Sequence, residues 1–174
     1  GDGHGRSKDG FGIDRDSSAR LIVQTALKNG VVNPAQIAYM LATAQHESEN
    51  FTAPDEHYGR DQARKLNYRG GEEYFGRGYA HLTHVDNYEK FDRLLALDGK
   101  LVASPRLAKD PEIAAKVLVI GVRDGIFTGK RLDRYINESS HDFYNARRTV
   151  NGVIATMPWS IKAAKQCQEY SEAR

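Results

Sequence analysis

Two glutamates, Glu47 and Glu56, have the residue type and the spacing that could place an acid and a base in one site. Apolar residues recur at three- and four-residue steps from Ile37 to Ala44, which predicts a helix whose core-facing stripe ends at Glu47. A carboxyl group at the edge of a core is partly desolvated, which raises its pKa and keeps it protonated near neutral pH. Glu47 is therefore a candidate general acid.

Glu56 follows nine positions later, beyond Pro54, with Asp55 and His57 as polar neighbours that favour its ionised form. One protonated carboxyl and one charged carboxylate across a cleft are what glycoside hydrolysis requires. From these residues alone a second interpretation stays open. Glu47 would be a helix-terminal residue paired to an arginine, and Glu56 a solvated loop charge.

A second segment with chemical potential reads YFGRGYAHLT, from Tyr74 to Thr83. Its glycines allow the backbone to come close to a ligand. Arg77 offers a forked donor, and Tyr79 offers a flat face for a sugar ring. Thr83 can hold a water molecule, or it can cap the next helix with Asp86 completing a capping box.

A third segment reads ARRTVNG, from Ala146 to Gly152. Arg148 and Asn151 can present a cation and an amide to a cleft, and a nearby arginine would alter the charge state of a carboxyl group. The alternative is an Asn-Gly helix stop preceded by solvated arginines.

The sequence lacks the motifs of a zinc protease, of a disulfide-bonded protein and of a nucleophilic hydrolase. His46-Glu47 resembles the start of a zinc protease helix, but Asn50 stands where the second histidine is needed. The lone Cys167 has no partner for an internal disulfide and no nucleophile-elbow context. We therefore expect no metal and no cofactor, although a site built from four histidines stays a formal alternative: His46, His57, His81 and His84.

The elements that must position these residues are mainly helical. Helices are expected over 19–28, 34–47, from Thr83 or His84 to near Asp98-Gly99, over 111–122 and over 159–172. Short helices are expected over 131–137 and 142–150, and an extended region over about 68–82. The segment after Asp110-Pro111 is apolar on nearly every side, so its helix should be central. Gly121 in that helix suits close packing against a neighbour.

Length and composition indicate one globular domain. The 174 residues suffice for one core. Residues 1–14, rich in glycine and charge, are expected to form a tail or linker, which leaves 15–174 as the domain. The net charge of +2, without Lys/Arg runs among aromatics, argues against nucleic acid. No apolar run approaches the roughly 18 residues of a membrane span, and no secretory signal is expected.

Taken together, the helix ending in AQHES, the further glutamate, YFGRGYAHLTHVDNYEKF and RRTVNG resemble the family 19 glycoside hydrolases, which comprise chitinases and related phage endolysins. The resemblance extends from Ile37 to Gly152 in the same order. It implies a mainly α, α+β lysozyme-like fold, with helices around a central buried helix and a small extended region beside the cleft.

The resemblance also implies roles. Glu47 would be the general acid, Glu56 the base that activates water, and Thr83 the residue that helps to position that water, in an inverting mechanism. His81 stands where the family usually has glutamine, which could alter a sugar contact. Other residues are implied to line or support the cleft: Arg77, Tyr79, Asn87, Tyr88 and Asn151.

The expected activity is that of a peptidoglycan muramidase, cutting the bond between N-acetylmuramic acid and N-acetylglucosamine, in a monomer without cofactor. The lack of cysteine pairs favours the bacterial or phage branch of the family. The interval between Glu56 and Gly76 is shorter than in many members, which implies a missing loop over the cleft and fewer subsites. We expect action in the periplasm or cell wall, as a phage endolysin or a delivered effector domain. Alternatives are a chitinase, a lytic transglycosylase and a non-catalytic wall-binding module.

Overall fold

The computed structural model describes residues 10–56 and 58–150, and these form a mainly helical structure. The α-helices are α2 (Arg15–Lys28), α3 (Pro34–Glu47), α4 (Gly59–Lys65), α5 (Val85–Leu94), α6 (Lys100–Ala103), α7 (Pro111–Asp124) and α8 (Phe143–Ala146). Three 3-10 helices join them: η1 (Pro105–Lys109), η2 (Leu132–Arg134) and η3 (Arg147–Thr149). The helix expected over 159–172, with Cys167, and the predicted site residue Asn151 lie outside the described residues.

Helix α3 begins as its sequence predicts. The Asn33 side chain accepts hydrogen bonds from the backbone N–H groups of Ala35 and Gln36, at 2.8 and 3.2 Å, and Pro34 occupies the first turn. Gln36 does not fold back into a capping box, because its Nε2 donates to the carbonyl oxygen of Ile136 at 2.7 Å. Every residue from Ile37 to Ala44 is buried, so Glu47 emerges directly from the core.

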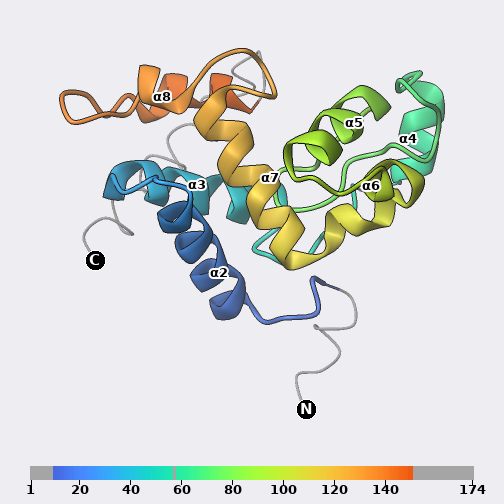
Figure 1. Ribbon diagram of the computed structural model, residues 1–174, viewed down its shortest axis with the longest axis horizontal. Helices are drawn as coiled ribbons and strands as arrows, with labels where there is room; N and C mark the ends of the chain where they lie inside the picture. The colour runs from blue at the N-terminus through green and yellow to red at the C-terminus, as the bar shows by residue number, and fades with distance from the viewer. Residues whose placement is uncertain (1–9, 57, 151–174) are drawn as a thin grey trace.

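Helix α7 separates two hydrophobic clusters, as expected for a helix that is apolar all round. Leu118 and Val119 belong to the larger cluster, with residues of α2 and α3, whereas Val117 belongs to the smaller one, with Tyr88 and Phe91 of α5. In Figure 1, α7 runs between α2 and α3 on one side and α5 and α6 on the other. The helix is capped by Asp110, which accepts from the Ile113 N–H at 3.1 Å.

Close packing at Gly121 is confirmed. A Cβ atom at this position would lie 2.3 Å from the ring of Phe127, a ring that packs against both clusters. Glycine is thus required here for the approach of a side chain rather than for its backbone conformation.

The N-terminal part of the structure differs from expectation. Helix α2 begins at Arg15, four residues early, because Asp14 caps it by accepting from the Ser17 N–H at 2.7 Å. Phe11, which we assigned to a tail, is only 5% exposed and stacks on Tyr79 with ring centroids 4.2 Å apart. The packed structure therefore includes Phe11.

The segment between α3 and α5 also contains two differences. Helix α4 was not predicted, because its seven residues are too few to show a clear period. The Thr83–Asp86 capping box is wrong: Thr83 Oγ1 donates to the His81 carbonyl at 2.7 Å, and Asp86 pairs with Arg69 at 2.7 Å.

The expected extended region is present as isolated bridges among the described residues. Arg77 pairs antiparallel with Asp55 and with Leu82, and the backbone N–H of Glu56 donates to the Gly76 carbonyl at 2.8 Å. Residues 74–83 form a glycine-rich loop, and these bonds fix the loop against the segment that carries Glu56. None of the described helices is long and apolar enough to cross a membrane.

Candidate active site

Glu47 is the last residue of α3, and its side chain is 22% exposed. Its Oε2 lies 4.0 Å from Nη1 of Arg147 and 3.9 Å from Nε2 of His46. Burial raises the pKa of the Glu47 carboxyl, while the charges of Arg147 and then His81 act in the opposite direction; burial is the larger effect. The structure therefore favours the protonated form of Glu47 more than an exposed position would.

A sharp reversal after α3 brings the chain back toward this carboxyl. Glu49, Asn50 and Phe51 have φ values of 51°, 63° and 66°, in the left-handed region that side chains adopt at a cost. The turn is held by the Phe51 N–H, which donates to Ser48 Oγ at 3.0 Å, and by Gln45 Nε2, which donates to Asn50 Oδ1 at 3.0 Å.

Two hydrogen bonds hold the Glu56 carboxylate. Its Oε1 accepts from the Gly76 backbone N–H at 2.8 Å, and its Oε2 accepts from the Tyr68 hydroxyl at 2.7 Å. Burial and this bond to Glu56 raise the pKa of Tyr68 to about 12, so Tyr68 keeps its proton and acts as a donor at neutral pH. Glu56 is thus fixed with both oxygens engaged as acceptors.

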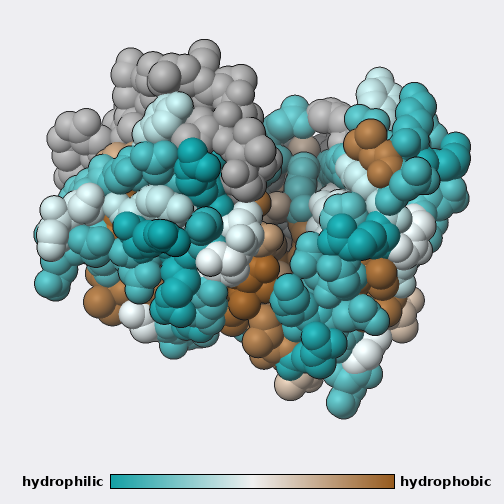
Figure 2. Space-filling model, turned by 90° about the horizontal axis from the view of Figure 1, so that it is seen from above, coloured by the Kyte–Doolittle hydropathy of each residue, from teal (hydrophilic) through white to brown (hydrophobic). Residues whose placement is uncertain are grey.

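The structure brings Glu47, Glu56 and Thr83 together around one cavity of about 550 Å³. The rest of its lining comes from five segments of the chain: Tyr68, Ala80, His81, His84, Asn87, Phe127, Thr128 and Val150. In the space-filling view the surface is hollowed between the two groups of helices, and hydrophobic residues gather in the hollow (Figure 2).

Gly76 provides the space between the base candidate and the threonine. A Cβ atom at Gly76 would lie 3.3 Å from Glu56 Oε1, 3.2 Å from Thr83 Oγ1 and 2.9 Å from His81 Cβ. The oxygens of Glu56 and Thr83 therefore approach Gly76 from different segments, and a side chain at position 76 would crowd both of them.

Three polar residues predicted for the cleft line the cavity. Thr83 donates to His81 and keeps its lone pairs available as acceptors. Asn87 Nδ2 donates to the Thr83 carbonyl at 2.9 Å, which fixes the threonine. His81 has its Nε2 3.2 Å from the Ala53 carbonyl.

Tyr79 and Tyr88 do not reach the cavity, and both are fully buried. Tyr79 hydrogen-bonds to Ser18 at 2.7 Å, so the prediction that its ring faces a sugar is wrong; the ring is needed in the core against Phe11. Tyr88 donates to the Phe75 carbonyl at 2.7 Å and accepts from Arg77 Nη1 at 3.0 Å. Tyr88 therefore supports the glycine-rich loop and does not line the cavity.

Arg77 also acts within the loop. Its side chain is 5% exposed, and the guanidinium lies over the Phe75 ring, 3.7 Å from the centroid. Its Nη1 donates to the Glu73 carbonyl at 2.6 Å. Arg77 therefore holds the loop together and borders a different cavity, described below, rather than the one shared by the two glutamates.

The arginine that faces Glu47 is Arg147, not the predicted Arg148. Arg147 is 7% exposed, whereas Arg148 does not line the cavity and has its Nε 3.4 Å from Asn145 Oδ1. Both arginines belong to the 3-10 helix η3, in which successive residues are turned by about 120°, and it is Arg147 that is turned toward Glu47. The short α8 and η3 give no period from which a sequence argument could choose between them.

The histidines do not form a metal site in the described part of the chain, where no group of three or more His, Cys, Asp and Glu side chains is placed to hold an ion. His84 lines the cavity and accepts from the Arg69 N–H through Nδ1 at 3.1 Å. Burial lowers its pKa, which favours the neutral ring. His57 is outside the described residues.

Comparison with known proteins supports the fold. No protein-family model and no curated protein matches the chain. Among solved structures, chitinase C of Streptomyces griseus HUT6037 has a TM-score of 0.64 at 18% identity, over 79% of this chain and 59% of the chitinase. A mutant of chitinase C gives 0.61 at 18% identity, over 80% of this chain and 71% of the mutant. A bacterial family 19 chitinase gives 0.62 at 16% identity, over 90% and 84%.

The chain thus spans about three fifths of the first of these neighbours. At such identities the likeness concerns the fold, and it agrees with the resemblance in the three motifs. The protein has the mainly helical fold of the family 19 chitinases.

Proposed function

We propose that this protein is a glycoside hydrolase that cleaves the bond between N-acetylmuramic acid and N-acetylglucosamine in peptidoglycan. The observation that carries the proposal is that Glu47 and Glu56 line the same cavity, one with its pKa raised by burial and the other held as a hydrogen-bond acceptor. Two carboxyl groups with such different surroundings suit an acid and a base.

In the proposed reaction, Glu47 donates its proton to the glycosidic oxygen while the bond from that oxygen to the anomeric carbon breaks. The departing sugar leaves with a free hydroxyl group. The partial burial of Glu47 favours the protonated form that this step consumes.

On the opposite face of the sugar, Glu56 accepts a proton from a water molecule whose oxygen forms the new bond to the anomeric carbon. Thr83 Oγ1, whose own hydrogen is donated to the His81 carbonyl, accepts the second hydrogen of this water. Because water attacks opposite to the leaving group, the anomeric configuration inverts. The base and the acid exchange their protons with solvent before the next turnover.

Peptidoglycan is the favoured substrate because the protein carries a small positive net charge of +2 and the bacterial wall is anionic. Chitin is the second candidate, since the neighbours in fold are chitinases. We propose that the protein acts as a monomer on the glycan strands of the wall, delivered as an endolysin or as part of an effector.

The deciding experiment is digestion of purified peptidoglycan and of chitin oligomers in ¹⁸O-water, with the products identified by mass spectrometry and the new anomer by NMR. The proposal requires muramic acid reducing ends that carry one ¹⁸O and the inverted configuration. Anhydro ends would indicate a lytic transglycosylase, products from chitin alone a chitinase, and binding without products a wall-binding module.

The substitution Glu47→Gln tests the acid. It keeps the size of the side chain but removes the transferable proton, so lysis of permeabilised Gram-negative cells should be lost while the circular dichroism spectrum stays native. Full activity of the variant would reject the assignment.

A further inference from the structure

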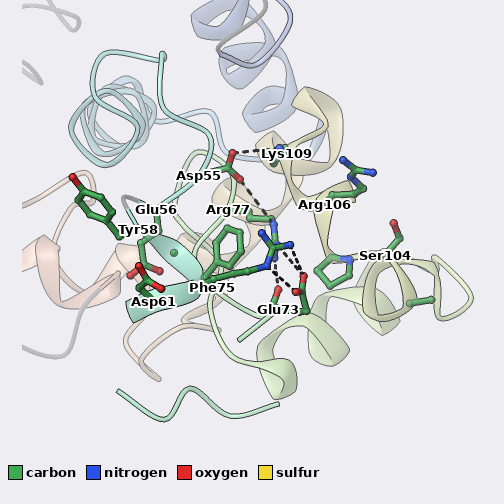
Figure 3. Close-up of a pocket in the computed structure, with 14 residues that line it drawn as sticks. Asp55, Glu56, Tyr58, Asp61, Glu73, Phe75, Arg77, Ser104, Arg106 and Lys109 are labelled. Atoms are coloured by element: carbon green, nitrogen blue, oxygen red, sulfur yellow. Dashed lines mark hydrogen bonds and ion pairs between the residues drawn. The ribbon is translucent and has the colours of Figure 1, made fainter. Parts of the chain in front are cut away.

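A second cavity, of about 620 Å³, lies on the other side of Glu56, which lines both cavities. Its walls come from the segment after α3, from the start of α4, from the glycine-rich loop, from the end of α6 and from η1 (Figure 3). Because one side chain borders both spaces, a glycan strand bound against Glu56 has groups attached to it within reach of the second cavity.

The lining of this second cavity is rich in charged groups, most of which are already paired. Arg60 Nε lies 2.8 Å from Glu73 Oε2, and Lys109 Nζ lies 3.3 Å from Asp55 Oδ2. The buried guanidinium of Arg77 is held by the Phe75 ring and by Glu73. In Figure 3 dashed lines join Asp55 to Lys109 and to Arg77, and Arg77 to Glu73.

Arg106 differs from the other cations of the cavity. It is exposed on η1, one turn from Lys109, and within residues 10–56 and 58–150 its side chain has no ion pair or hydrogen bond. The side chain lines the cavity together with the neighbouring Ser104. Arg106 thus presents a forked donor toward a space large enough for several ligand atoms.

The chemistry of this cavity fits a charged substituent better than a neutral sugar. A chitin strand carries no ionised groups, whereas the peptide attached to the lactyl group of muramic acid carries free carboxylates. An arginine binds a carboxylate through two parallel hydrogen bonds. A mixed lining of cations and carboxylates also suits a peptide that has both charges.

We propose that the second cavity binds the stem peptide of peptidoglycan, with a peptide carboxylate on Arg106. This inference rests on the proposed function, because it assigns the peptide-bearing sugar to the strand that Glu56 contacts. Arg106 is then a specificity residue that distinguishes a peptide-bearing glycan from a bare one.

The test compares peptidoglycan glycan strands that carry their peptides with strands stripped of peptides by an amidase and then methyl-esterified at the lactyl carboxylates that the amidase exposes. For each variant we measure kcat/KM on both substrates and divide the value for the peptide-bearing strand by the value for the stripped strand. Arg106→Gln should lower this ratio about fivefold, the upper range for an exposed charge pair. An unchanged ratio, including equal losses on both substrates, would overturn the proposal and indicate only a general charge effect or a sugar contact.

Arg93→Gln is the matched control. Arg93 is exposed on α5 and lines neither cavity, so the variant removes the same charge from the protein without touching the proposed site. Its ratio should equal that of the wild type. A ratio lowered equally in both variants would overturn the proposal.

Binding separates this inference from the proposed function. With the Glu47→Gln protein, calorimetry should show a disaccharide tetrapeptide binding about fivefold more weakly when Arg106→Gln is added. The disaccharide whose lactyl group carries a methyl ester in place of the peptide should show no such difference. If the wild-type protein cleaves no glycan, the proposed hydrolysis fails even where this peptide effect is observed. If it cleaves and the peptide effect is absent, only the inference on the cavity fails.

Discussion

Tyr68 donates its hydroxyl hydrogen to Glu56 Oε2 at 2.7 Å, across a loop that contains the whole of α4. The ring of Tyr68 meets His84 edge-on, with centroids 5.0 Å apart, so the donor itself is held in place. Sequence reasoning did not identify Tyr68, which lies in no motif. The glutamate proposed as the base is therefore positioned by a residue from outside the recognised segments.

The substitution Tyr68→Phe should lower kcat about tenfold and leave KM nearly unchanged. A tenfold loss corresponds to roughly 1.5 kcal/mol, which is what one hydrogen bond to a charged group contributes. Steady-state kinetics on soluble glycan strands measure this. Tyr144→Phe removes a hydroxyl from an exposed tyrosine on α8 that does not line the cavity and serves as control. Equal kcat in wild type and Tyr68→Phe would show that Glu56 needs no such support.

Gly76→Ala should lower kcat by about a hundredfold, because its methyl group would enter the space between Glu56 and Thr83 and displace them by a fraction of an ångström to an ångström. Gly71→Ala is the control in the same loop. A Cβ at Gly71 meets nothing within 4 Å, although its φ of 97° makes the substitution strained. Both variants should lose thermal stability, but only Gly76→Ala should lose its activity at temperatures where it is folded.

Arg147→Met should shift the alkaline limb of the pH profile of kcat/KM to higher pH. The Arg147 charge favours ionised Glu47 and so lowers the pKa of that carboxyl; without the charge, the pKa rises further above its ordinary value and the acid stays protonated to higher pH. Arg147→Lys keeps the charge and should keep the limb near that of the wild type. A downward shift in Arg147→Met would contradict the assignment of Glu47 as the acid.

Tyr79→Phe tests whether this residue is structural. The buried Ser18 hydroxyl loses its partner, so the free energy of unfolding should fall by roughly 1 kcal/mol in urea titrations, and KM should stay unchanged. In the double variant Ser18→Ala with Tyr79→Phe, neither hydroxyl is left unpaired, and part of the stability should return. A raised KM for Tyr79→Phe with unchanged stability would restore the sugar contact that the structure excludes.

Much of the helical framework could be predicted because its signals are local. Asn33-Pro34 and Asp110-Pro111 begin α3 and α7 as expected. The mostly apolar residues of α7 correctly indicated a central helix, which exposes only Glu112 and Lys116. The short elements could not be predicted in this way. Helix α4, α8 and the 3-10 helices have at most seven residues each, which is too short for a period to emerge.

The sequence by itself determined that a carboxyl group would stand where the stripe of α3 leaves the core, since helical spacing places Glu47 directly after buried residues. It also indicated Glu56 and Thr83 as its partners. Only the tertiary structure decided that these three share a cavity, that Arg147 rather than Arg148 faces Glu47, and that Tyr79 belongs to the core. The physical reason is that these relationships depend on left-handed turns, on the rotation of short helices and on contacts between distant segments, none of which produces a local pattern in the chain.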